Sequence, residues 1–129
     1  MKVIIAGSRD ITNYDVVRAC IEDAINRTGW HVDTVLSGCA RGVDRLGERW
    51  AELHGIPVER FPADWARYGR RAGYLRNEEM AKVADALIAI WDGVSPGTKH
   101  MIRLAFRQNL KFAIYTLARG YPQLLMLKR

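Results

Sequence analysis

Three short segments of the chain combine glycine with serine or threonine and a basic side chain, a composition that suits phosphate binding. Glycine lets backbone N–H groups approach an anion closely, and arginine or lysine adds positive charge. Any one segment could equally serve a tight turn, but three of them favour a shared ligand. None is a specific motif by itself, since neither a Walker loop nor the dinucleotide-binding fingerprint is present. The segments are Gly7-Ser8-Arg9-Asp10, Ser37-Gly38-Cys39-Ala40-Arg41-Gly42-Val43-Asp44 and Trp91-Asp92-Gly93-Val94-Ser95-Pro96-Gly97-Thr98-Lys99.

Residues 65–77 form a basic and aromatic cluster, in which arginines alternate with aromatic side chains and no acidic residue occurs. This composition suits stacking on nucleic-acid bases together with contact to their phosphates. It would equally suit a lid over one nucleotide, or a solvated basic loop. Arg76-Asn77 is the sharpest pair, because a guanidinium can bind a phosphate in a bidentate manner. The cluster consists of Trp65, Arg67, Tyr68, Arg70, Arg71, Tyr74 and Arg76.

Acidic candidates for catalysis are few. Asp44 lies in the first turn of a predicted helix, where a carboxylate often only stabilises the helix dipole. Glu78 and Glu79 are adjacent on a predicted helix, so they point about 100° apart. The histidines and the two cysteines have no metal-ligand spacing. We therefore predict no catalytic residue, metal or cofactor, and Asp44 and Glu79 are the alternative catalytic candidates.

These residues must be positioned by a chain in which strands and helices alternate. Such alternation predicts an α/β fold, a Rossmann-like three-layer sandwich around a central parallel sheet of about five strands in the order 3-2-1-4-5. In that order the three glycine-containing segments lie near the switch point, where such sheets bind ligands. The predicted strands are Lys2–Ala6, Asp33–Ser37, Pro57–Phe61, Ala86–Trp91 and Phe112–Leu117, and the predicted helices are Tyr14–Thr28, Val43–His54, Gly73–Val83 and Thr98–Asn109.

The length of 129 residues predicts one domain, residues 1–118, followed by a C-terminal tail of residues 119–129. The apolar run 124–127 in this tail would pack on the domain or meet a second subunit, and we predict a homodimer. The net charge of +6 favours an anionic partner. The chain has no apolar run long enough for a membrane span, and its unpaired thiols suit a cytoplasmic protein without a membrane partner.

Taken together, the segments resemble the SLOG superfamily, and in particular its YspA-type family, which is related to YpsA. The resemblance extends from Met1 to about Tyr115 and implies a Rossmann-like fold with a nucleotide-type ligand. Cys39 stands where the family pattern usually has glycine. The matching segments are Val3–Arg9, Ser37–Asp44, Gly55–Val58, Arg76-Asn77 with Met80, Ala84–Ile88, Trp91–Gly93 and Gly97–Lys99.

Two further families are similar in the same places. DprA proteins, which bind single-stranded DNA, have similar Gly-Ser-Arg and Ser-Gly-x-Ala-x-Gly-x-Asp loops and a similar Arg-Asn pair. The LOG phosphoribohydrolases place an arginine where Arg76 stands, and a loop that ends in a catalytic glutamate where Gly97-Thr98 stands. Met101 occupies the position of that glutamate here. A thioether can neither accept a proton from water nor stabilise a cation, so the LOG reaction is not expected.

The predicted function is binding of a nucleotide or a nucleotide derivative, such as a nucleoside phosphate, ADP-ribose or an NAD-like molecule, by a protein that senses or sequesters it. The alternatives are a nucleotide N-glycosidase of LOG type and a DprA-like protein that binds single-stranded nucleic acid. The predicted ligand-binding residues are Gly7, Ser8, Arg9, Ser37, Gly38, Ala40, Arg41, Gly42, Asp44, Arg76, Asn77, Trp91, Asp92, Gly93, Ser95, Gly97, Thr98 and Lys99.

Overall fold

A computed structural model describes all 129 residues, except for the side chain of Ala118. Strands and helices alternate along the chain as predicted, and the predicted bounds agree with the observed ones to within two residues. The elements are β1 (Lys2–Gly7), α1 (Tyr14–Thr28), β2 (Thr34–Ser37), α2 (Val43–Leu53), β3 (Val58–Arg60), α3 (Trp65–Tyr68), the 3-10 helix η1 (Gly69–Arg71), α4 (Ala72–Val83), β4 (Ala86–Trp91), α5 (Pro96–Arg107), β5 (Lys111–Ala118) and β6 (Tyr121–Lys128).

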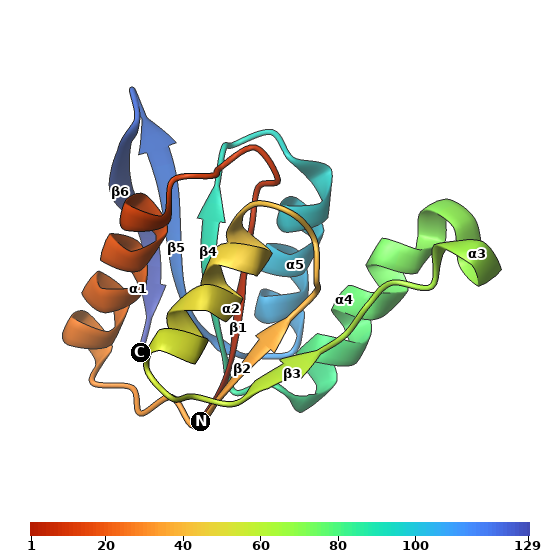
Figure 1. Ribbon diagram of the computed structural model, residues 1–129, viewed down its shortest axis with the longest axis horizontal. Coiled ribbons are helices and arrows are strands. Elements are labelled where there is room, and N and C mark those ends of the chain that lie inside the picture. The colour runs from red at the N-terminus through yellow and green to blue at the C-terminus, as the bar shows by residue number, and fades with distance from the viewer.

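The strands form one sheet in the order β3-β2-β1-β4-β5-β6, and all neighbours are parallel except β5 and β6 (Figure 1). The Rossmann-like α/β fold and the order of the first five strands are therefore confirmed. In this order β2 and β3 lie on one side of β1, whereas β4 and β5 lie on its other side. The carboxyl end of β1 is therefore the switch point of the sheet.

Two hydrophobic cores lie on opposite faces of the sheet because successive strand residues point to opposite sides. Val3 and Ile5 of β1 pack with α1 and α2, whereas Ile4 and Ala6 pack with α4 and α5. The two helix layers lie in front of and behind the sheet in Figure 1. None of the helices in the described part of the chain is long and apolar enough to cross a membrane.

The predicted C-terminal tail forms β6, which pairs with β5 in an antiparallel hairpin. The register shifts between Ile114 and Tyr115, which pair with Met126 and Leu124. Because of this shift, Leu124 and Leu127 both pack against the core that α1 covers. Two residues of the apolar run are thus partly buried within the subunit, and the homodimer stays a prediction.

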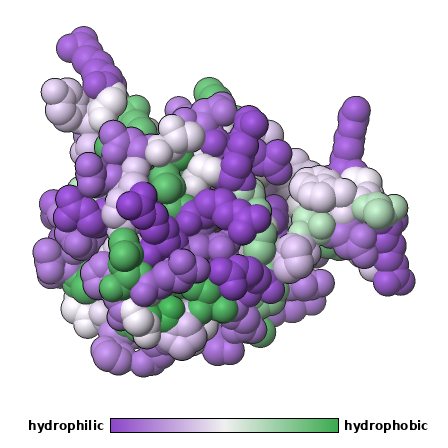
Figure 2. Space-filling view, viewed as in Figure 1, coloured by the Kyte–Doolittle hydropathy of each residue, from purple (hydrophilic) through white to green (hydrophobic). Residues whose placement is uncertain are grey.

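The stretch 62–72, predicted as a loop, contains the short helix α3 and the turn η1. The Asp64 side chain accepts a hydrogen bond from the Arg67 N–H at 3.2 Å and so caps α3. The left-handed backbone of Gly69, with a φ of 57°, ends it. No residue of α3 or η1 is buried, and the segment stands away from the body of the molecule (Figures 1 and 2).

Candidate functional site

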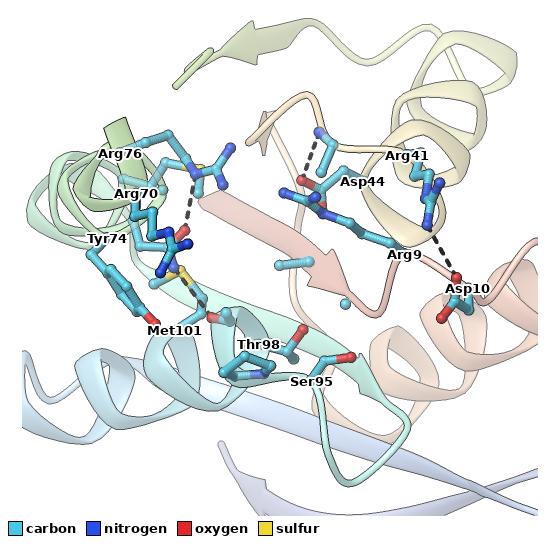
Figure 3. A pocket seen from close by; sticks show the side chains of 18 of the residues that line it. Arg9, Asp10, Arg41, Asp44, Arg70, Tyr74, Arg76, Ser95, Thr98 and Met101 are labelled. Atoms are coloured by element: carbon cyan, nitrogen blue, oxygen red, sulfur yellow. Dashed lines mark hydrogen bonds and ion pairs between the residues drawn. The ribbon is translucent and has the colours of Figure 1, made fainter. Parts of the chain in front are cut away.

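A cavity of about 400 Å³ opens at the carboxyl ends of the central strands, at the switch point of the sheet. Its walls come from the end of β1, the loop before α2, the segment from α3 to α4, and the start of α5. Arg9 and Asp44 lie across the cavity from Arg70, Tyr74 and Arg76 in Figure 3. The predicted site residues that line this cavity are Gly7, Arg9, Ala40, Arg41, Asp44, Arg76, Asn77, Ser95, Gly97 and Thr98.

Arg76 is fixed in the cavity wall by two acceptors. Its Nε donates to Oδ1 of Asn77 at 3.0 Å, and its Nη1 donates to the carbonyl of Gly38. A Cβ at Gly38 would lie 2.7 Å from that Nη1, so a larger residue here would displace the guanidinium from its place on the loop. Burial lowers the pKa of Arg76 from its ordinary value, while the Asp44 carboxylate acts in the opposite direction. The remaining guanidinium N–H groups are available to a ligand.

Asn77 connects Arg76 to the third glycine-containing segment. Its Nδ2 donates to the carbonyl of Gly97 at 3.3 Å and lies 3.1 Å from Nδ1 of His100. Because Nδ2 can only donate, Nδ1 of His100 is the acceptor and the imidazole is neutral there. Burial lowers the pKa of His100, in agreement with that neutral form. Asn77 thus orients Arg76 against the start of α5.

Asp44 lies in the first turn of α2 and only 6% of it is exposed. Its Oδ2 accepts a hydrogen bond from the N–H of Ala40 at 3.1 Å, and the backbone N–H of Gly7 also favours its ionised form. Burial raises the pKa of Asp44 to about 6, although these two N–H groups and the charge of Arg76 act to lower it. The cavity therefore contains a carboxyl group that titrates close to neutral pH.

The start of α5 forms another part of the cavity wall. Pro96 is at the first helical position, and the Ser95 side chain makes no capping hydrogen bond to the helix. The hydroxyl of Ser95 donates instead to Asp92 at 2.8 Å. The first N–H groups of a helix have no partner within the helix, so those of Gly97 and Thr98 provide an anion-binding terminus.

Aromatic side chains lie at the mouth of the cavity. Trp65 is 50% exposed and Tyr74 is 44% exposed, and both line it together with Arg70. The guanidinium of Arg9 lies 6.0 Å from the Trp65 ring, within cation–π range. A second, smaller hollow of about 220 Å³ shares Arg9, Trp65 and Arg76 with the cavity and reaches Arg45. Flat, partly exposed rings beside guanidinium groups can stack on a base.

Several predicted ligand-binding residues do not line the cavity and instead hold the loops in place. Ser8 accepts a hydrogen bond from the Asp92 N–H at 2.9 Å, and Ser37 donates to Oε2 of Glu48 at 2.6 Å. Gly42 has a φ of 77°, and a Cβ there would lie 2.5 Å from the carbonyl oxygens of Ser8 and Arg9. Cys39 has a φ of 64°, in the left-handed region that favours glycine.

Except for Gly38, which is in the loop before α2, the remaining predicted residues lie in or near the loop before α5, outside the cavity. Trp91 donates from Nε1 to the carbonyl of Ser95 at 3.1 Å, and Asp92 accepts from the N–H groups of Val94 and Ser95. Gly93 and Lys99 are exposed, as is the alternative catalytic candidate Glu79 on α4. Gly38 lines the smaller hollow.

The cavity also contains residues that the sequence analysis did not assign to it. Trp65, Arg70 and Tyr74 belong to the basic and aromatic cluster, whose composition was the available signal. Met80 and Met101 carry no chemical signal, because their side chains also belong to the core beneath α4 and α5. The additional lining residues are Ala6, Asp10, Trp65, Arg70, Gly73, Tyr74, Met80, Pro96 and Met101.

The charge of the cavity wall is mainly positive. Four arginines line it against two aspartates, and one of these, Asp10, pairs with Arg41 at 3.4 Å. Both members of that pair are largely exposed, so the pair adds little stability. No group of three or more His, Cys, Asp or Glu side chains is arranged to hold a metal ion, as far as the structure describes them. The excess of arginine gives the cavity wall a net positive charge, which favours an anion.

Comparison with known proteins finds two similarities. The model of the family described as "YspA, cpYpsA-related SLOG family" matches residues 1–68, which contain the first two glycine-containing segments. The Gene 61 protein of Mycobacterium phage D29 is 36% identical over 115 residues, which cover 84% of this chain and 91% of that protein. The family match includes the residues around Gly7, Gly38 and Asp44, which belong to one wall of the cavity.

Proposed function

Because the chain belongs to the YspA, cpYpsA-related SLOG family, we propose that its cavity binds a nucleotide or a nucleotide derivative. The ligand is a nucleoside phosphate, ADP-ribose or an NAD-like molecule, and the protein senses or sequesters it. The observation that carries this proposal is the pairing, in one cavity, of a helix N-terminus and fixed arginines with exposed aromatic rings.

The phosphate end of the ligand would lie at the start of α5. The N–H groups of Gly97 and Thr98 and the positive end of the helix dipole attract an anion there. Arg76, held by Asn77 and Gly38, adds a guanidinium whose orientation is set before the ligand arrives. Prior orientation reduces the entropy that binding must overcome.

The base would lie at the mouth, against the rings of Trp65 and Tyr74. Stacking on an aromatic ring contributes about 1–3 kcal/mol per base and tolerates any base. Both rings retain exposed area for this contact. The guanidinium groups of Arg9 and Arg70 also line the cavity and favour a π-rich ligand.

A panel of nucleotides tests the proposal by thermal unfolding. A ligand present at 100 times its dissociation constant stabilises the folded state by about 2.7 kcal/mol. For a chain of this size the melting temperature then rises by on the order of 10 °C. We expect such a rise with at least one of AMP, the other nucleoside monophosphates, ADP-ribose or NAD. A panel without any shift at millimolar concentration contradicts the proposal.

Single-stranded nucleic acid is the second candidate ligand, favoured by the projecting segment around α3. Tyr68 is 41% exposed and the segment carries Arg67, Arg70 and Arg71 beside Trp65. If an oligonucleotide binds there, the logarithm of its binding constant falls with the logarithm of salt concentration, with a slope of about −0.7 per phosphate contacted. A slope steeper than about −2 for a ten-nucleotide strand, together with weak mononucleotide binding, favours this candidate.

Hydrolysis of the N-glycosidic bond is the other alternative, and Asp44 with its pKa of about 6 is the group that could support it. We expect no enzymatic rate, because Met101 is 1% exposed and packs in the core at the position of the LOG glutamate. Chromatography of AMP, other nucleoside monophosphates and NAD after incubation should show no free base. Turnover of about 1 per second that is lost in Asp44→Asn would establish the hydrolase instead.

A further inference from the structure

Two buried acids on α2 lie one helical turn apart and differ in how their charge is balanced. Glu48 is 4% exposed, and its carboxylate contacts Arg60 at 3.0 Å, Arg45 at 3.5 Å and the Ser37 hydroxyl at 2.6 Å. Its charge is neutralised within the protein. Glu48 therefore needs no ligand, and its contacts explain why it can be buried.

Asp44 is buried to nearly the same degree but makes no ion pair within 4.0 Å among the described residues, and the charge of Arg76 acts on it only from a greater distance. Its carboxylate accepts a hydrogen bond from the backbone N–H of Ala40, and the backbone N–H of Gly7 also favours its charged form. Among the side chains that the structure describes, no Lys, Arg or His nitrogen lies within 4.0 Å of this carboxylate. A carboxylate offers about four acceptor positions, so Asp44 has unused acceptor capacity at the wall of the cavity.

An ionised carboxylate can only accept hydrogen bonds, and it repels phosphate. The part of the ligand next to Asp44 must therefore present donors, namely hydroxyl or N–H groups. In the proposed nucleotide pose the phosphate lies at the start of α5 and the base lies at the exposed rings of Trp65 and Tyr74. The sugar lies between them, within the cavity that Asp44 lines with only 6% of its surface exposed.

We propose that Asp44 accepts hydrogen bonds from the 2′- and 3′-hydroxyls of a ribose, so that the site selects ligands with a free ribose diol. This inference rests on the proposed function, since it assigns the sugar of the same ligand. It makes the protein selective for ribonucleotides and their derivatives against deoxyribonucleotides. It also disfavours DNA strands as the ligand of this cavity, because they lack the 2′-hydroxyl and esterify the 3′-oxygen.

The test compares each of the four ribonucleoside 5′-monophosphates with its 2′-deoxy counterpart by isothermal titration calorimetry on the unaltered protein. A hydrogen bond to a charged group contributes about 1.5–3 kcal/mol, so each deoxy compound should bind at least about tenfold more weakly. For the tightest nucleotide, the 3′-deoxy compound should show a similar loss. Chromatography of the samples afterwards confirms that the nucleotides are intact.

Asp44→Asn should then bring the ratio of ribo to deoxy affinity close to one, because an amide offers less acceptor capacity and no charge. Asp15→Asn is the matched control: Asp15 also lies in the first turn of a helix, but its side chain is 82% exposed on α1 and outside the cavity. This control should keep the ratio of the unaltered protein. The melting temperature of each variant verifies that it is folded.

Equal binding of ribo and deoxy compounds by the unaltered protein overturns the inference without reference to any variant. If the folded Asp44→Asn variant keeps the ratio of ribo to deoxy affinity of the unaltered protein, the inference is also overturned. The same holds if this variant changes its preference among the bases while that ratio stays the same. If none of the monophosphates, ADP-ribose or NAD binds at millimolar concentration, the proposed function fails and this inference fails with it. That outcome is distinct from equal binding, in which only the ribose assignment is lost.

Discussion

Gly7→Ala is expected to lower the free energy of unfolding by about 3 kcal/mol or more, the largest stability effect that we predict for a single methyl group. A Cβ at this position would lie 2.1 Å from the carbonyl oxygen of Ile90 and 2.6 Å from Cγ2 of Val43. The first contact is with backbone of β4, paired with β1 at this residue, and the second is with a fully buried side chain of α2. Neither can move without separating parts of the core.

Gly97→Ala is the matched control for this substitution. A Cβ at Gly97 would meet no heavy atom within 4 Å, and alanine favours a helix over glycine by up to about 1 kcal/mol. Unfolding in urea, followed by circular dichroism, measures both variants. Their midpoints should move in opposite directions, or Gly97→Ala should leave the midpoint unchanged. A Gly7→Ala midpoint equal to that of the unaltered protein would show that the close approach of β1, β4 and α2 is not as described.

The fold was predictable because local pattern and long-range packing agree over most of the chain. Val3, Ile4 and Ile5 form a continuous apolar run because both faces of β1 are covered, which is typical of a parallel sheet. In α1, the Asn13 side chain accepts from the Asp15 N–H at 2.9 Å, and Gly29 ends the helix with a φ of 73°. Both signals are local and can be read from residue types.

The strand β6 was not predicted because its pattern does not alternate. The sequence Leu124-Leu125-Met126-Leu127 has four apolar residues in a row, whereas a half-buried strand should alternate. The register shift beside Tyr115 places Leu124 and Leu127 on the same face although they are three residues apart. Such a bulge depends on the partner strand, so the sequence of β6 alone does not specify it.

The site was predictable to the level of its loops but not to the level of every side chain. A serine in a glycine-containing loop can bind a ligand or the protein backbone, and residue type does not distinguish the two. Ser8 and Ser37 make internal hydrogen bonds away from the cavity, Thr98 lines the cavity, and Ser95 does both, since its hydroxyl donates to Asp92. The role of Gly38 also depends on a distant residue, because the space that it leaves is filled by Arg76 from α4.

Arg76→Ala is expected to weaken nucleotide binding by about 2 kcal/mol or more, which is about thirtyfold, with little effect on the fold. Two of the five N–H groups of this guanidinium are used by Asn77 and Gly38, and these bonds fix its plane at the cavity. The others can form two parallel hydrogen bonds to phosphate oxygens. Alanine removes both the charge and this geometry, and no other arginine of the cavity wall is tied to both Gly38 and Asn77 among the described residues.

Arg76→Lys separates charge from geometry. Lysine keeps the charge but is a point donor that cannot make a bidentate contact, and it cannot donate to Gly38 and Asn77 in the same plane. We therefore expect an intermediate loss of affinity. Arg103→Ala is the matched control, because Arg103 is exposed on α5 outside the cavity and its removal changes the net charge by the same amount.

Calorimetric titration with the tightest nucleotide of the panel measures all three variants. The affinity should decrease in the order Arg103→Ala, Arg76→Lys, Arg76→Ala, and the first should equal that of the unaltered protein. If Arg76→Ala and Arg103→Ala bind alike, general electrostatic attraction by the basic chain accounts for binding, and the fixed guanidinium has no special role. If Arg76→Lys binds as tightly as the unaltered protein, the charge matters and the hydrogen bonds from Asn77 and Gly38 that orient the guanidinium do not.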